Sequence, residues 1–77
     1  MTYAVVEMAA GEVCGVTLSD SDEDATNHAV ALARENTECS EEEIREHLDT
    51  AGSHAEGDYS VHVFVATRLK KQSAKKG

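Results

Sequence analysis

The sequence predicts an α+β domain in the order ββααβ, with a three-stranded antiparallel or mixed sheet and two helices packed on one face. Three observations support this prediction. The chain has 77 residues, which suffices for one small hydrophobic core. Apolar segments typical of strands stand at both ends of the domain, and two segments with helical periodicity lie between them. We expect residues 1–69 to form one compact domain and residues 70–77 to form a basic, disordered tail.

The first two strands are expected to form a hairpin. Residues 2–8 (TYAVVEM) and residues 13–18 (VCGVTL) are apolar and rich in valine, and a four-residue connection that includes Gly11 joins them. Antiparallel strands accept a connection of this length. Gly15 inside the second strand indicates a bulge, or a place where another group packs closely.

The first helix is predicted to follow the acidic segment at residues 19–24 (SDSDED). Ser19 or Ser21 can cap the free backbone N–H groups, and the acids favour the positive end of the helix dipole. The inner face follows the helical spacing and consists of Ala25, His28, Ala29, Leu32 and Ala33. Because this face is rich in alanine, the helix can lie close to the sheet. We expect it to end near Asn36.

The second helix has the clearest local pattern in the sequence. Ser40 and Glu43 have the spacing of a capping box, and Cys39 and Ile44 that of a hydrophobic staple. Gly52 is placed to end the helix in a left-handed conformation. The predicted inner face consists of Ile44, His47, Leu48 and Ala51.

The last strand is predicted over residues 59–69 (YSVHVFVATRL), after a polar loop at residues 53–58. This strand is apolar on both faces, which is typical of a central strand or of one covered by a partner. With both helices on one face, the other face of the sheet stays open. Exposed apolar strand surface favours an interface, so we expect a homodimer or a bound partner.

The sequence contains no motif for catalysis, metal binding or cofactor binding. The histidines and cysteines are at least seven residues apart, whereas zinc sites need two ligands close together in the chain. No glycine-rich phosphate-binding motif is present. Cys14 and Cys39 are too few for a disulfide framework and are expected to be reduced. The sequence therefore predicts a non-enzymatic cytoplasmic protein without a cofactor, a metal or a membrane-spanning segment.

The charge is distributed unevenly along the chain. Residues 1–67 hold all 15 acidic residues and only two basic ones, Arg34 and Arg45, which gives this part a net charge of −13. Residues 68–77 hold the other five basic residues. So acidic a body would repel DNA and RNA, and direct nucleic-acid binding is not expected.

Two acidic clusters near the helix starts form the candidate partner-binding site. On the second helix, Glu42, Glu46 and Asp49 recur once per turn of about 5.4 Å, and such a row can imitate a phosphate backbone. We therefore predict a basic, nucleic-acid-binding protein as partner, as for small acidic phage or mobile-element inhibitors of restriction and CRISPR effectors. The predicted partner-binding residues are Asp20, Asp22, Glu23, Asp24, Glu42, Glu46 and Asp49.

Other interpretations of these features stay open. Helix starts favour acidic residues in any protein, and an acidic surface also suits solubility or a salt-rich cytoplasm. The alternative function is that of a small dimeric accessory or antitoxin-like domain that uses its open sheet face. The basic tail can be solvated, fold back on the acidic body or reach a second acidic surface.

Residues 1–36, with TYAVVEM followed by SDSDEDATNHAVALA, resemble the start of HicB-type antitoxin domains. Those domains place a third strand before the helix, and this chain has no room for one. The resemblance covers less than half of the sequence, so no function is carried over from it.

Overall fold

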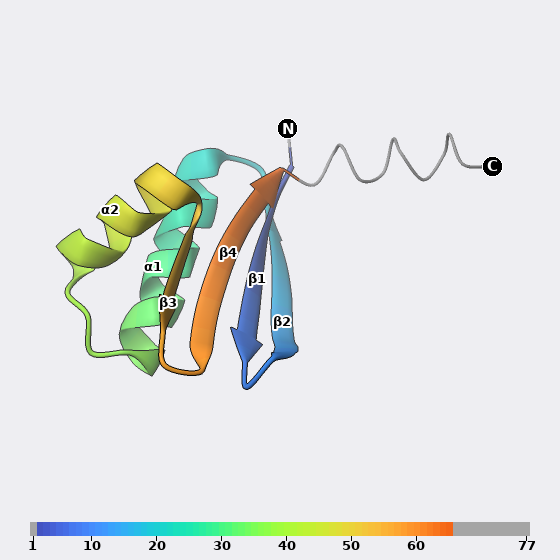
Figure 1. Ribbon diagram of the computed structural model, residues 1–77. Coiled ribbons are helices and arrows are strands. Elements are labelled where there is room, and N and C mark those ends of the chain that lie inside the picture. The colour runs from blue at the N-terminus through green and yellow to red at the C-terminus, as the bar shows by residue number, and fades with distance from the viewer. Residues whose placement is uncertain (1, 66–77) are drawn as a thin grey trace.

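The computed structural model describes residues 2–65, and it has the α+β class that the sequence predicts. Its elements are β1 (Tyr3–Ala9), β2 (Glu12–Ser19), α1 (Asp22–Asn36), α2 (Glu41–Ala51), β3 (Ser53–Glu56) and β4 (Tyr59–Val65). The strand order is β2-β1-β4-β3, and every neighbouring pair is antiparallel. Both helices lie on one side of the sheet (Figure 1). The predicted tail at residues 70–77 lies outside the described residues.

The sheet has four strands, so the prediction of three strands is wrong. Residues 53–56, which were expected to be loop, form β3 and pair with β4 from Ser53 opposite His62 to Glu56 opposite Tyr59. Gly57 adopts the left-handed conformation (φ 61°) that the tight turn between the two strands requires. The additional strand makes β4 central, as the apolar character of its two faces predicts.

The predicted hairpin and the irregularity at Gly15 are confirmed. The register of β1 and β2 shifts between Glu7, which lies opposite Gly15, and Met8, which lies opposite Val13. Cys14 is therefore the extra residue of a bulge. A Cβ atom at Gly15 would lie 3.4 Å from Glu7 Oε1, at the near limit of ordinary van der Waals contact, so the carboxylate packs closely against this glycine. The chain then passes from β2 directly into α1, without an intervening strand.

Helix α1 is capped by Ser21, whose Oγ accepts a hydrogen bond of 3.1 Å from the Asp24 N–H. The alanine face is confirmed, because Ala25, Ala29 and Ala33 are fully buried. These small side chains let the helix backbone approach the sheet closely. The buried face also includes Val30, which the predicted spacing omits.

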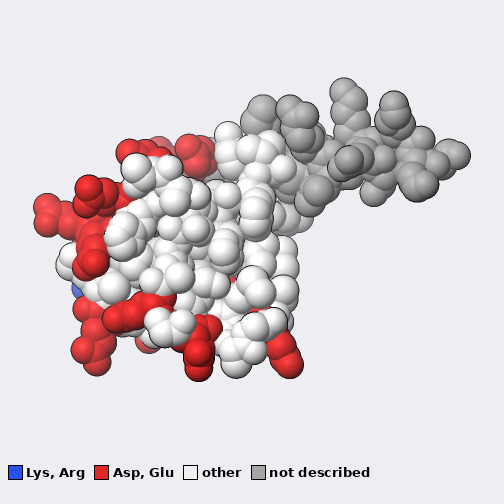
Figure 2. Space-filling view, viewed as in Figure 1, with Lys and Arg blue, Asp and Glu red and all other residues white. Residues whose placement is uncertain are grey.

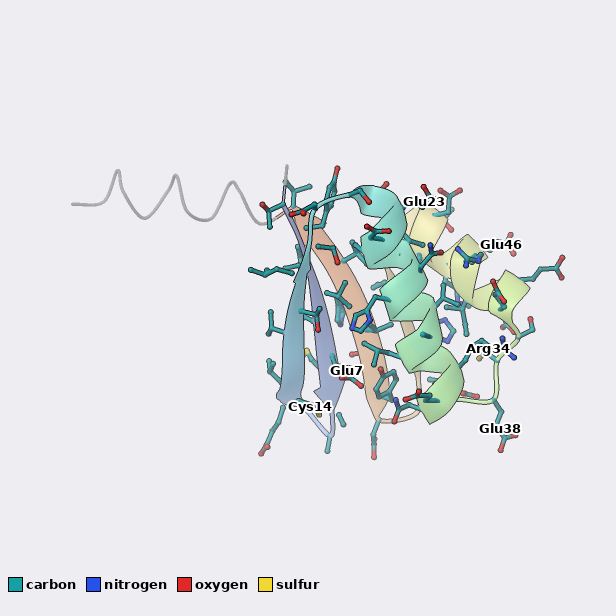
Figure 3. All side chains as sticks on the ribbon, turned by 180° about the vertical axis from the view of Figure 1, so that it is seen from behind. Glu7, Cys14, Glu23, Arg34, Glu38 and Glu46 are labelled. Carbon is teal, nitrogen blue, oxygen red and sulfur yellow. The ribbon has the colours of Figure 1, made fainter. Side chains whose placement is uncertain are left out.

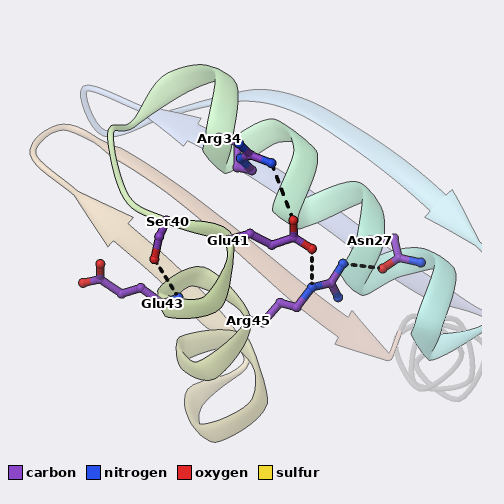
Figure 4. Close-up of polar contacts among 6 residues, drawn as sticks. All are labelled: Asn27, Arg34, Ser40, Glu41, Glu43 and Arg45. Carbon is purple, nitrogen blue, oxygen red and sulfur yellow. Dashed lines mark hydrogen bonds and ion pairs between the residues drawn. The ribbon is translucent and has the colours of Figure 1, made fainter.

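Helix α2 has the predicted caps at both ends. Ser40 Oγ accepts a hydrogen bond of 3.2 Å from the Glu43 N–H, and Gly52 (φ 75°) donates its N–H to the Leu48 carbonyl at 2.9 Å. The buried stripe is narrower than predicted: Ile44 and Leu48 are buried, whereas His47 and Ala51 are exposed. Figure 4 includes the cap at Ser40.

The core lies between the sheet and the two helices. Val5, Val61 and Ile44 are at most 1% exposed and join both layers. No second layer covers the other face of the sheet among residues 2–65 (Figure 1). Neither helix in this part of the chain is long and apolar enough to cross a membrane.

Candidate partner-binding surfaces

The side of the sheet without helices is named here the open sheet face. Its residues follow from the strand register, since directly opposed residues of neighbouring strands point to the same side. They are Ala4, Val6, Met8, Val13, Val16, Leu18, Ser53, Ala55, Ser60, His62 and Phe64. None of them is Asp, Glu, Lys or Arg.

Large apolar side chains on the open sheet face are exposed to solvent. Leu18 is 64% exposed, Val16 59%, Val13 57% and Phe64 51%. The ring of His62 stacks on Phe64, with ring centroids 5.9 Å apart and an interplanar angle of 9°. Figure 2 shows this side of the molecule largely free of acidic side chains, which gather around the helices and the lower loops.

A second surface is the groove between the start of α1 and the middle of α2, named here the acidic groove. It has a volume of about 570 Å³ and is lined by Asp22, Thr26, Arg45, Glu46, Leu48 and Asp49. Its acidic residues come from both predicted clusters. Leu48 is 8% exposed and belongs to the core, so the groove also has an apolar part.

The structure brings together three of the seven predicted partner-binding residues. Asp22 of α1 and both Glu46 and Asp49 of α2 line the acidic groove. The other four are exposed but lie outside this lining: Asp20, Glu23, Asp24 and Glu42. Figure 3 shows the helical side, with Glu23 at the start of α1 and Glu46 on α2.

Helix capping explains only part of this acidity. Asp22 lies in the first turn of α1, where the helix dipole favours a negative charge. The dipole effect falls off within one turn. Glu46 and Asp49 lie beyond the first turn of α2, which comprises residues 41–43, so capping does not account for them.

Both arginines of the described residues are held by contacts across the two helices. Arg45 donates from Nε to Glu41 Oε2 and from Nη2 to Asn27 Oδ1, each at 2.9 Å. Arg34 Nη1 lies 3.5 Å from Glu41 Oε1 (Figure 4). Glu41 therefore pairs with both arginines, and neither of the two ion pairs formed among residues 2–65 includes Asp22, Glu46 or Asp49.

A pair of stacked histidines connects α2 with β3. His47 Nδ1 and His54 Nδ1 are 2.7 Å apart, which requires that one nitrogen donates its proton to the other. His54 is only 2% exposed, and its buried Nε2 has no hydrogen-bond partner. Burial lowers the pKa of His54, and so does His47, whereas Glu43 and Glu56 oppose this shift. Sequence reasoning placed His54 in a loop and missed this pair, because nothing in the sequence indicates that the short segment is a strand.

Two other titratable groups lie near the sheet. Burial is the main cause that raises the pKa of the Cys39 thiol, so the thiol stays protonated near neutral pH. Tyr59 Oη donates a 3.0 Å hydrogen bond to Glu7 Oε2, and burial together with this carboxylate raises the pKa of Tyr59. Among residues 2–65, no three His, Cys, Asp or Glu side chains are placed to hold a metal ion.

Comparison with protein-family models, with curated proteins and with solved structures found no match to this chain.

Proposed function

We propose that this protein is a non-enzymatic binding module whose acidic groove receives a basic segment of a nucleic-acid-binding protein. The observation that carries the proposal is the meeting of Asp22, Glu46 and Asp49 on one groove, although they come from two helices. Exposed carboxylates at neighbouring positions reinforce each other's negative potential, and a basic side chain placed among them relieves their repulsion.

The groove offers two kinds of contact to a basic side chain. Its carboxylates pair with the charged head of a lysine or arginine, and Leu48 offers apolar surface to the aliphatic stem. The net charge of −13 over residues 1–67 attracts a basic partner from a distance and increases the association rate.

The biological role that follows is inhibition of the partner, because this protein occupies the partner's nucleic-acid-binding groove. A protein that fills the basic groove of a nucleic-acid-binding partner competes with the nucleic acid for the same lysines and arginines. This is the mode of action proposed here, and it corresponds to the class of small acidic inhibitors from phages and mobile elements.

The site is tested with an arginine-rich peptide as probe and two matched triple variants. Asp22→Asn, Glu46→Gln and Asp49→Asn together remove the charges of the groove. Three exposed carboxylates elsewhere are removed in the control variant: Glu12→Gln, Glu35→Gln and Glu38→Gln. Loss of three ion pairs at about 0.5 kcal/mol each predicts roughly tenfold weaker peptide binding for the groove variant.

The control distinguishes a site from general acidity. Fluorescence anisotropy at fixed ionic strength should show at most a twofold loss for the control variant. An equal loss in both variants would mean that net charge alone attracts the peptide, as expected for an acidity that serves solubility or salt adaptation. A triple variant with Glu42→Lys, Glu46→Lys and Asp49→Lys should likewise fail to capture a native partner from cells. If this variant still retained the partner at raised salt, that would contradict the proposal that the carboxylates imitate a phosphate backbone.

A further inference from the structure

We propose that the open sheet face is a homodimer interface, on which a second copy of this chain packs face to face about a two-fold axis. The face belongs to the sheet side opposite the helices and is distinct from the acidic groove. Self-association is therefore a property in addition to the proposed binding of a basic partner.

The open sheet face has the chemistry of an interface. Its four most exposed large side chains are apolar. Three of them belong to β2, namely Val13, Val16 and Leu18, and the fourth is Phe64 of β4. A contiguous exposed apolar area of this kind marks an interface in a protein that otherwise covers its surface with charge. The concentration on β2 places the centre of the contact towards β1 and β2, away from the short β3.

The charge of the protein favours a second copy as the occupant of this face. Two copies of a chain with net charge −8 repel each other, and they meet at least cost where neither carries a charge. The open sheet face has no Asp, Glu, Lys or Arg, so it satisfies this condition for both copies when His62 is neutral. A two-fold contact also requires a surface that is complementary to itself, and an uncharged apolar face meets that requirement. A basic partner would be drawn instead to the carboxylates on the helical side.

The size of the face is compatible with a weak dimer. Three of its strands have seven or eight residues, and β3 has four. With about 4.8 Å between strands and about 3.3 Å per residue, they make a face of roughly 410 Å² before the relief of the side chains is added. This is below the roughly 800 Å² per partner of a standard stable interface, so the face fits a weak, transient dimer and not a permanent one.

Sedimentation velocity on the full chain, from micromolar concentrations to about 500 µM, tests for a weak dimer. Wild type should pass from monomer to dimer. Leu18→Lys should weaken the dimer at least tenfold even though it reduces the net negative charge, because it places a charge inside the contact. Thr17→Glu is the matched control, since Thr17 is exposed on the same strand but points to the other side of the sheet. It should leave the dissociation constant within about threefold, once the small added repulsion is screened by salt.

The outcomes separate the dimer from the proposed groove. Raised salt should preserve or strengthen the dimer, because the interface is apolar, whereas it should weaken peptide binding at the groove. Unchanged urea midpoints for both variants show that they are folded. A wild type that stays monomeric up to about 500 µM, or a dimer that Leu18→Lys leaves intact, would overturn the proposal.

Discussion

At the scale of single residues, the histidine pair between α2 and β3 ties the stability of the fold to pH. His54 is buried against His47, and its Nε2 is without a hydrogen-bond partner, so a proton on His54 is costly in the folded state. The pKa of His54 is lowered below its usual 6.5, mainly by burial and then by the charge of His47. Glu43 and Glu56 reduce this shift without reversing it.

The sign of the pH dependence follows from proton linkage. Between the lowered pKa of the folded state and the usual value of 6.5 in the unfolded chain, the unfolded state binds more protons. The stabilisation is therefore complete above about pH 6.5 and is lost as the pH falls through that value. Urea unfolding at pH 7.5 and at pH 5 should show a fall in the midpoint for wild type.

Substitution of His54 tests the origin of this fall. His54→Leu should show a smaller fall between the two pH values, because the buried titratable group is gone. His28→Gln, on α1, serves as the control and should keep the full fall. If His54→Leu loses as much stability as wild type on acidification, the pH dependence has another source.

At the scale of elements, the packing of α1 depends on the small size of its inner side chains. Ala25, Ala29 and Ala33 are each fully buried in the core. They place α1 against β1 and β4 and so fix where the start of this helix meets α2. The acidic groove depends on this placement, because Asp22 is held at the first turn of the same helix.

Two leucine substitutions on α1 test the close packing. Ala29→Leu should destabilise the protein by about 1–3 kcal/mol, since the larger side chain must displace its neighbours in the core. Ala31→Leu, exposed on the same helix, should change the free energy of unfolding by less than about 0.5 kcal/mol. Chemical denaturation measures both values, and equal effects would mean that the alanine face is not closely packed.

The elements differ in how far the sequence predicts them. The two helices and their caps at Ser21, Ser40 and Gly52 follow from local patterns, because capping and periodicity act within a few residues. Strand β3 is not predicted from the sequence, because its four residues (SHAE) are mostly polar and their pairing with β4 is a tertiary contact. Burial of His54 then follows from that pairing and is equally hidden in the sequence.

The candidate site was likewise predictable only where local spacing determines it. Helical spacing puts Glu46 and Asp49 on one side of α2 without knowledge of the fold. It cannot show that Asp22 joins them or that Glu42 stays outside the groove, because both depend on how α1 and α2 meet. The remaining predicted residues are exposed acids near a helix start, where capping alone places such residues.

At the scale of the whole molecule, charge divides the described protein into two sides. The helical side carries the acidic groove. The sheet side, which Figure 2 shows, carries a mainly apolar face without Asp, Glu, Lys or Arg. The core separates them, so a second copy on the sheet would leave the groove accessible. A dimer would then present two acidic grooves facing away from each other, and two linked sites bind a repetitive basic partner more tightly than one.

The central claim is that the acidic groove receives basic side chains, and the most direct measurement is an NMR titration. The full chain labelled with ¹⁵N is titrated with an arginine-rich peptide, and amide chemical-shift changes are followed residue by residue. We expect the largest changes around the groove, at Asp22, Thr26, Glu46 and Asp49. Changes of similar size at the distant acids Glu12 and Glu35, or changes centred on the open sheet face, would contradict it.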